Sequence, residues 1–228
     1  EPGGVLGGEA GGRGRLGTDG AIEEAYRLAR EEPQTYVLMD QFNNPASIAA
    51  HFIGTGQEII AQTEGRATHV VVSLGTSGTA MGIAKRMKAS APHIRVVAVE
   101  PYAGHKIQGL KNMQESYPPG IYDKRALDRI VHVEDEEAYE CARRLAREEG
   151  ILSGMSAGAA LAGALRIAGE LDAAGEEGLI VFICPDTGER YLSTTLFAPP
   201  ARHGLGVRSV ASECLEILVS PAGGHALF

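Results

Sequence analysis

The stretch that decides the fold is HVVVSLGTSGT, residues 69–79. Its first six residues form a nearly continuous apolar run, and a short run of this kind predicts a strand that is buried on both faces of a sheet. Gly, Ser and Thr follow, and a helical pattern begins near Thr79. A buried strand that passes through a glycine loop into a helix is typical of a parallel α/β sheet.

The same alternation of strand and helix patterns extends along the chain in both directions. Apolar runs such as IRVVAV and LIVFIC again predict strands with no solvent-facing side. Apolar residues at helical spacing lie between these runs, and Asp19 is a possible cap of the first helix. The sequence therefore predicts an α/β fold, a parallel sheet flanked by helices on both faces. The expected strands are residues 36–39, 69–74, 94–99, 129–133 and 179–184, and the expected helices are residues 21–32, 48–62, 79–89, 135–149 and 156–171.

The two ends of the chain differ from this pattern. Residues 1–16 are crowded with glycine and show no hydrophobic periodicity, so we expect an irregular segment there. Residues 198–228 carry Pro, Gly and Ala clusters around one apolar patch, and we expect a C-terminal tail of uncertain structure. The longest apolar run, residues 151–168, is rich in Gly and Ala and includes Arg166, which favours a buried helix over a membrane span.

Composition excludes several classes of partner. The chain of 228 residues is 44% hydrophobic and 22% charged, with a net charge of -8, which disfavours nucleic acid and anionic membranes. Its three cysteines, Cys141, Cys184 and Cys214, are far apart and form no CxxC pair. They indicate reduced thiols in a cytoplasmic protein, without a disulfide framework. No cluster of His and Cys suggests a metal site.

The glycine loop is the first candidate site. A loop of this kind at the start of a helix directs several backbone N–H groups to one point, and the partial positive charge there suits a phosphate dianion. Spacing alone leaves a second interpretation open, an ordinary tight turn in which a threonine caps the helix. Neither a Walker loop nor a dinucleotide GxGxxG motif is present. The five loop residues are Gly75, Thr76, Ser77, Gly78 and Thr79.

Two further segments frame the last expected helix and strand. GMSAGAA, residues 154–160, opens the Ala-rich helix, where Ser156 is suited to be the N-cap. The polar segment PDTGERY, residues 185–191, follows the last apolar run, and open α/β sheets place ligands at the carboxyl ends of their strands. Within it, Glu189 and Arg190 are equally consistent with a surface ion pair.

Taken together, the motifs of residues 17–197 resemble those of the cysteine synthases, which are pyridoxal-phosphate (PLP) enzymes of fold type II. The shared motifs stand in the same order and at similar spacing, and the segment GLKNMQESYPPGIYD, residues 109–123, is more similar to the B-type enzymes than to the A-type. The resemblance implies a tryptophan-synthase-β-like fold, with residues 17–40 as the remnant of an incomplete small domain and residues 41–197 as the large PLP-binding domain. The motifs are QFNNP, TGQEI, GTSGT, VEP, IQGL, ARRLAREEGIL, GMSAGAA and PDTGERYLSTTLF.

The resemblance also implies roles for individual residues. The loop from Gly75 to Thr79 corresponds to the family's phosphate cradle, and Ser156 to the residue that faces the pyridine nitrogen of PLP. Asp186 lies in a loop near the pyridine end. The residues that match the substrate side of the family's site are Gln41, Phe42, Gly109 and Lys111.

The implied reaction is replacement of the leaving group of an activated serine, O-acetylserine or O-phosphoserine, by a sulfur nucleophile to make cysteine. Lys111 is then a candidate receptor for an anionic leaving group or sulfur donor, or a solvated surface lysine. Cystathionine β-synthase and serine/threonine dehydratase are neighbouring alternatives with the same cradle. The resemblance implies a homodimer for the complete enzyme, with small molecules as its other partners.

One part of the family's pattern is missing. None of the lysines Lys85, Lys88, Lys106, Lys111 and Lys124 stands in the context of the family's Schiff-base lysine, so no catalytic residue is assigned in this chain. We therefore expect the chain by itself to be inactive and marginally folded. Two alternatives are a non-catalytic domain that binds PLP or a protein partner, and a nucleotide-binding α/β domain. The absence of Walker and dinucleotide motifs argues against the latter.

Overall fold

A computed structural model describes residues 18–115 and 117–197. The chain divides between Asp40 and Gln41 into two compact units, and each unit is described by itself. The segments expected to be irregular, residues 1–16 and 198–228, lie outside the described residues, as does Cys214.

The first unit contains helix α1, Thr18–Glu31. The helix begins before Asp19, so this residue stands in its first turn and is not its cap. Within the helix, the Tyr26 hydroxyl donates a hydrogen bond of 2.6 Å to the carboxylate of Asp40, which follows the helix. The prediction of a strand at residues 36–39 is wrong, because the described part of this unit contains no second strand that could pair with it. Val37 and Met39 are instead 84% and 75% exposed.

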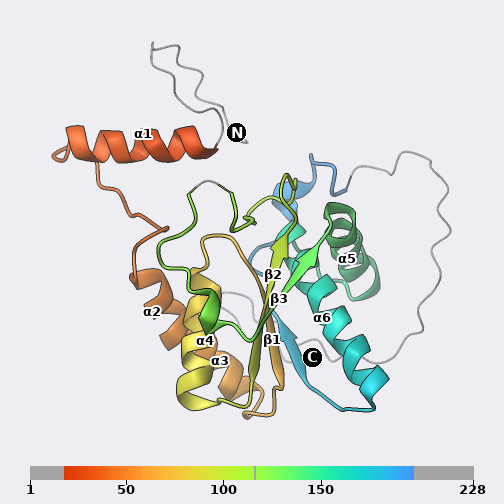
Figure 1. The fold of residues 1–228 in the computed structure, drawn as a ribbon. Helices are drawn as coiled ribbons and strands as arrows, with labels where there is room; N and C mark the ends of the chain where they lie inside the picture. Colours follow the sequence, from red (N-terminus) through yellow and green to blue (C-terminus); the bar gives the residue numbers. More distant parts are fainter. Residues whose placement is uncertain (1–17, 116, 198–228) are drawn as a thin grey trace. The chain divides into compact units, whose positions relative to one another are not determined.

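The second unit is built on a four-stranded parallel sheet in the order β3-β2-β1-β4 (Figure 1). β1 lies between two neighbours, with His69 opposite Arg95 on one side and Ile180 on the other. A central strand covered on both faces has no exposed side, which explains the apolar run of residues 69–74. The prediction of an α/β fold with a parallel sheet is thereby confirmed. The strands are β1 His69–Ser73, β2 Arg95–Pro101, β3 Arg129–Val133 and β4 Ile180–Phe182.

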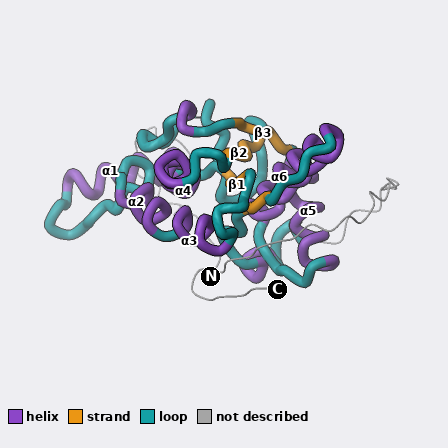
Figure 2. Tube along the Cα trace, turned by 90° about the horizontal axis from the view of Figure 1, so that it is seen from below, coloured by secondary structure: helices purple, strands orange, loops and turns teal. Residues whose placement is uncertain are grey.

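Helices cover both faces of this sheet (Figure 2). Val70 and Val72 of β1 belong to the core on the side of α4, while Val71 belongs to the core on the side of α5 and α6. The alternation of side chains along a strand therefore feeds two separate hydrophobic cores. The helices on one side are α2 Ala46–Ile53, α3 Thr55–Gln62 and α4 Gly78–Ser90, those on the other are α5 Asp135–Glu148 and α6 Met155–Ala174, and two short 3-10 helices are η1 Lys124–Ala126 and η2 Gly188–Tyr191.

Two predicted elements differ in extent from those observed. The helix expected over residues 48–62 is interrupted at Gly54, whose ψ of -94° leaves the helical region and separates α2 from α3. The last strand pairs over three residues only, instead of the six expected over residues 179–184. The run of residues 151–168 forms most of α6. The first half of this helix is buried. Among the described helices, none combines the length and apolar character needed to cross a membrane.

Candidate functional site

The glycine loop lies where β1 ends and α4 begins. Ser77 occupies the N-cap position of α4 with a left-handed backbone, φ 69°, and its side chain caps no backbone N–H group. It is 3% exposed, and its hydroxyl has no hydrogen-bond partner within the described residues. A tight turn capped by threonine is therefore not what forms, since Thr79 stands inside the helix. A buried hydroxyl without a partner, at a helix N-terminus, is suited to an anionic ligand.

The two glycines of the loop allow close approach of other segments. A β-carbon on Gly75 would lie 2.5 Å from the carbonyl oxygen of Gly109, and one on Gly78 would lie 2.6 Å from the Ser47 hydroxyl. Real β-carbons do not approach backbone oxygens so closely, so Gly75 is required for the contact with Gly109. The structure thus brings Gly109, predicted on the substrate side of the site, against the loop predicted to hold phosphate.

His51 of α2 also belongs to this site, although it was not predicted from the sequence. Its Nε2 lies 3.1 Å from the hydroxyl of Thr79, and its Nδ1 lies 2.9 Å from that of Thr55. Burial lowers the pKa of His51 below its usual value, because the neutral ring is favoured away from water. The ring therefore fixes the Thr79 hydroxyl from behind the loop. The contact joins residues 28 positions apart, so no local sequence pattern predicts it.

We expect this histidine to make the stability of the chain sensitive to acid. A group whose pKa is lowered by folding contributes stability fully above its unfolded pKa, near 6.5, and loses it as the pH falls below that value. Unfolding in urea at pH 7.5 and pH 5.5 should therefore show a smaller loss of stability on acidification in His51→Gln than in the original chain. Burial also lowers the pKa of His69. His69→Gln should therefore reduce the pH dependence as well, without changing the glycine loop, and it serves as the comparison.

Ser156 lies in the first turn of α6 and is 6% exposed. The N-cap of this helix is Gly154, so the prediction that Ser156 serves as its cap is wrong. The hydroxyl of Ser73, at the end of β1, donates a hydrogen bond of 2.6 Å to the backbone oxygen of Ser156. This bond ties the first turn of α6 to the strand that leads into the glycine loop. The side chain of Ser156 caps no N–H group of α6 and makes no hydrogen bond with the described residues.

Asp186 lies at the same helix terminus. Its Oδ2 accepts a hydrogen bond of 2.5 Å from the Tyr191 hydroxyl, while its Oδ1 is buried and without a partner among the described residues. A β-carbon on Gly154 would lie 2.3 Å from this Oδ1. Burial, and then the bond to Asp186, raises the pKa of Tyr191, so its hydroxyl keeps its proton and donates. An isolated β-bridge between Ser153 and Thr187 joins the residue before Gly154 to the residue after Asp186.

The segment from Gly109 to Lys111 runs beside the end of β1. The backbone N–H of Lys111 donates a 2.8 Å hydrogen bond to the carbonyl oxygen of Leu74, directly before the glycine loop. Its side chain is 14% exposed, and its ammonium lies 3.9 Å from the Glu115 carboxylate. The structure therefore does not support the interpretation of Lys111 as a freely solvated surface lysine.

The predicted substrate residues Gln41 and Phe42 lie in the turn before α2. The carbonyl oxygen of Phe42 accepts a long hydrogen bond of 3.3 Å from the N–H of Ile121. Gln41 is exposed, and within the described residues its side chain makes no hydrogen bond to the glycine loop. Backbone contacts thus bring Lys111 and Gly109 to the loop, whereas Gln41 makes no such contact among the described residues.

The arrangement fits a phosphate-bearing cofactor better than a metal or a redox-active thiol. Among residues 18–115 and 117–197, no group of three His, Cys, Asp or Glu side chains could hold a metal ion. Cys141 and Cys184 are free thiols, and burial raises the pKa of each to about 11, which keeps them unreactive near neutral pH. The partnerless hydroxyl of Ser77 and the helix N-terminus behind it fit a phosphate group.

The fold and site define an α/β protein with an anion-binding loop at the carboxyl ends of parallel strands. Residues 7–186 match the family described as pyridoxal-phosphate dependent enzyme. The chain belongs to this family.

Several relatives are similar over most of this chain. It is 49% identical to a cysteine synthase of Aquifex aeolicus over 183 residues, which cover 80% of this chain and 56% of that protein. It is 39% identical to cysteine synthase B of Escherichia coli over 181 residues, or 79% of this chain and 58% of that protein. Cysteine synthase A of the same organism is 38% identical. Because the two E. coli identities are almost equal, the resemblance to the B-type stays a prediction.

Solved structures agree with the fold. A crystal structure of O-ureido-L-serine synthase superposes with a TM-score of 0.73 at 38% identity and covers 83% of this chain and 61% of that protein. O-acetyl serine sulfhydrylase isoform 3 of Entamoeba histolytica has a TM-score of 0.71 at 35% identity, with 81% and 56% covered. The chain thus spans less than two thirds of the length of these relatives.

Proposed function

We propose that this chain is the cofactor-holding part of a PLP-dependent enzyme that replaces the leaving group of an activated serine by a sulfur nucleophile to make cysteine. The observation that carries the proposal is the loop at the end of β1, where the buried Ser77 hydroxyl lacks a partner and Gly109 packs against Gly75. The relatives named cysteine synthase and O-acetyl serine sulfhydrylase support the same reaction.

In this proposal the loop residues hold the phosphate of PLP. The backbone N–H groups at the start of α4 and the hydroxyls of Thr76, Ser77 and Thr79 donate to the phosphate oxygens. His51 holds the Thr79 hydroxyl in place through its Nε2, 3.1 Å away. Gly75 and Gly78 keep the loop free of β-carbons where Gly109 and Ser47 approach.

Ser156 is proposed to face the pyridine nitrogen at the other end of PLP. PLP supplies an electron sink for the bonds that break at the substrate, and the protein sets how strong this sink is. A neutral hydroxyl does not enforce protonation of the nitrogen as a carboxylate would, which favours loss of a β-leaving group. Asp186 lies beside Gly154, near this turn, and its partnerless Oδ1 could accept one further hydrogen bond there.

Lys111 is proposed to lie on the substrate side, with Gly109. Its mostly buried ammonium is placed to attract an anionic leaving group or an anionic sulfur donor, which would extend the donors from O-acetylserine to O-phosphoserine. Gln41 and Phe42 are proposed to line the amino-acid pocket. A homodimer and a cytoplasmic location of the complete enzyme, and a small-molecule amino acid and sulfur donor as its partners, remain predictions.

A second candidate function, left open by the sequence, is a non-catalytic domain that binds PLP. None of the five lysines of the given sequence stands in the family's lysine motif, and the ammonium of Lys111 lies 3.9 Å from the Glu115 carboxylate. A lysine is needed to link the cofactor covalently and to take the proton from the substrate. The two candidates share the phosphate-holding loop and differ in catalysis.

Equilibrium dialysis with PLP and with pyridoxal, which lacks the phosphate, tests the shared part. We expect the 228-residue chain to bind PLP at least about tenfold more tightly than pyridoxal, because charge-assisted hydrogen bonds to the loop are lost with the phosphate. We also expect no visible absorbance of a lysine-linked cofactor and no cysteine from O-acetylserine and sulfide. Equal affinity for the two compounds would contradict the proposed cofactor site.

A longer chain separates the two candidates. If sequence upstream of Glu1 supplies the lysine motif and the family's Asn loop, the longer chain should make cysteine from O-acetylserine and sulfide. A longer chain that has both motifs, binds PLP and yields no cysteine would favour the non-catalytic domain.

A further inference from the structure

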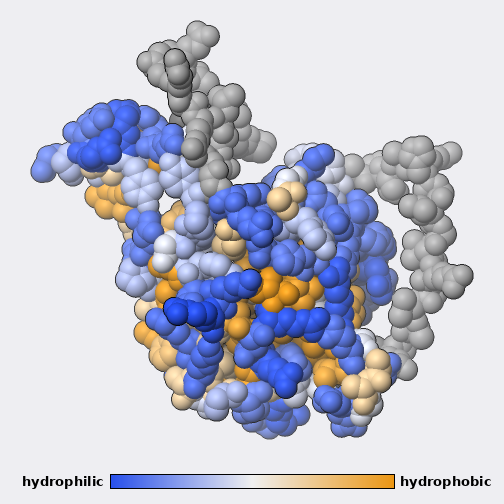
Figure 3. All heavy atoms as spheres, in the orientation of Figure 1, coloured by the Kyte–Doolittle hydropathy of each residue, from blue (hydrophilic) through white to orange (hydrophobic). Residues whose placement is uncertain are grey.

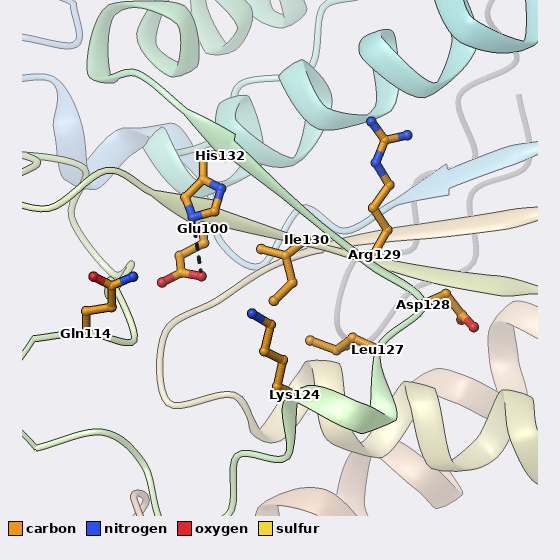
Figure 4. A pocket seen from close by; sticks show the side chains of 8 residues that line it. All are labelled: Glu100, Gln114, Lys124, Leu127, Asp128, Arg129, Ile130 and His132. Atoms are coloured by element: carbon orange, nitrogen blue, oxygen red, sulfur yellow. Dashed lines mark ion pairs between the residues drawn. The ribbon is translucent and has the colours of Figure 1, made fainter.

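A second candidate site is a pocket beside β3, one of the two edge strands of the described sheet. Its volume is about 340 Å³, within the range of small-molecule sites. Figure 3 shows apolar surface over β3 with hydrophilic side chains around it. The lining residues, drawn in Figure 4, are Glu100, Gln114, Lys124, Leu127, Asp128, Arg129, Ile130 and His132.

Glu100 is a buried carboxylate with incomplete hydrogen bonding. It is 5% exposed, and its Oε1 accepts a 2.7 Å hydrogen bond from the backbone N–H of Met113. Its Oε2 makes no hydrogen bond with residues 18–115 or 117–197 and lies 3.7 Å from Nε2 of the half-exposed His132. Figure 4 shows this oxygen on the side of the imidazole. A buried negative charge with one donor favours a ligand that brings a positive charge or further N–H groups.

Lys124 provides the opposite charge in the same pocket. Its side chain points toward Ile130 and the space next to Glu100 (Figure 4). In the part of the chain that the structure describes, its ammonium makes no ion pair or hydrogen bond, and neither does the side-chain amide of Gln114.

The remaining charged residues of the wall are already engaged. Arg129 pairs with Glu170, and the Asp128 carboxylate accepts the backbone N–H of Val96 at 2.7 Å. Glu100 keeps one oxygen, Oε2, which the His132 ring approaches at 3.7 Å without a hydrogen bond, and Lys124 has no partner among the described residues, so these two opposite charges are the ones offered to a ligand.

We propose that this pocket binds a small α-amino acid. The ammonium of such a ligand would pair with Glu100, its carboxylate with Lys124, and an aliphatic side chain would contact Leu127 and Ile130. A zwitterion satisfies both charges at once, whereas an anion would face Glu100 and a cation would face Lys124. Charge complementarity therefore selects the class of ligand, and the apolar wall selects its side chain.

The pocket is connected to the turn that carries Lys111. Met113, held by Glu100, follows Asn112, whose side chain donates to the Pro101 carbonyl oxygen at 2.8 Å and accepts the Gln114 N–H at 2.9 Å. The ligand would therefore contact Glu100, which bonds to Met113, and Gln114, whose backbone N–H bonds to Asn112. Binding in the pocket does not depend on the proposed cofactor role of the glycine loop, since none of the lining residues belongs to it.

Isothermal titration of the PLP-loaded 228-residue chain with L-leucine tests the proposal. We expect a dissociation constant of about 1 mM or lower, which is ordinary for a ligand of nine heavy atoms. Isopentylamine lacks the carboxylate and 4-methylpentanoate lacks the ammonium, and each should bind at least about tenfold more weakly. Lack of L-leucine binding at about 10 mM, or equal binding of all three compounds, would overturn the proposal.

Three variants locate the bound leucine. Lys124→Met should weaken leucine binding at least about tenfold, while Lys85→Met, the same change at an exposed lysine of α4, should leave it unchanged. Gly75→Ala should weaken PLP binding and leave leucine binding unchanged. The reverse result, with leucine lost in Gly75→Ala and kept in Lys124→Met, would place the leucine in the proposed active site and refute the second pocket. If PLP does not bind while leucine binds as expected, the proposed function is contradicted and the leucine pocket is not.

Discussion

Replacing Gly158 by alanine is expected to destabilise the chain by about 3 kcal/mol or more, because the added methyl group has no room. Gly158 lies in α6 where this helix crosses α5. A β-carbon there would lie 2.0 Å from the carbonyl oxygen of Ala138 and 2.8 Å from the backbone nitrogen of Ala142. Both atoms are backbone, so the contact can be relieved only by moving one helix away from the other.

A matched control exists on the same helix. Gly169 is exposed, and a β-carbon there would meet nothing within 4 Å. Gly169→Ala should therefore stabilise the chain by about 0.5 to 1 kcal/mol, the usual gain from alanine in a helix. Urea unfolding followed by circular dichroism measures both changes. Similar stabilities for the two variants would show that α5 and α6 are not packed as closely as described.

The second large effect is expected at the glycine loop. Gly75→Ala should weaken PLP binding by about 10- to 100-fold, because the new methyl group would stand 2.5 Å from the Gly109 carbonyl oxygen and displace the loop. Displaced donors lose hydrogen bonds to the charged phosphate, which are among the stronger ones in proteins. Equilibrium dialysis of PLP, with circular dichroism as a check on folding, gives the result.

Two comparisons make this outcome decisive. Gly169→Ala should bind PLP like the original chain, and binding of pyridoxal should change less than binding of PLP in Gly75→Ala, because pyridoxal has no phosphate to lose contact with. An unchanged PLP affinity in a folded Gly75→Ala chain would remove the glycine loop from the cofactor site.

The parallel sheet could be predicted because its signal is local and strong. Val70, Val71 and Val72 are each buried, on alternating faces, and no polar residue interrupts them. The strand predicted at residues 36–39 failed for the opposite reason. An apolar run is a strand only when a neighbouring strand completes its hydrogen bonds, and a pattern of four residues does not reveal whether that neighbour is present.

The break of the predicted helix at Gly54 shows a related limit. Glycine is tolerated inside helices, so its presence alone does not end one. Packing is what favours separate helices here, since a β-carbon on Gly56 at the start of α3 would lie 2.7 Å from the β-carbon of Arg86 in α4. The sequence shows Gly54 and Gly56, but it does not reveal how closely α3 packs against α4.

The candidate site was predictable where it is contiguous in sequence. Residues Gly75 to Thr79 form one loop, and their chemistry can be inferred from residue type and position between strand and helix. The residues that support the loop could not be inferred this way. His51 reaches Thr79 from another helix, and Ser73 reaches the backbone of Ser156 across 83 positions. Such contacts depend on the packing of the layers, which no local spacing encodes.

The central position of β1 has a consequence for how the chain is made. β1 pairs with β2 soon after both have been synthesised, but its second neighbour, β4, begins at Ile180. The hydrogen bond from the Thr68 hydroxyl to the Leu179 carbonyl oxygen, next to this pairing, joins residues 111 positions apart and closes a long loop. Closing such a loop costs entropy before it yields contacts, so it comes late in folding. During that interval the nascent chain carries a strongly apolar strand with one open edge, the stage at which it is most prone to aggregate and most dependent on chaperones.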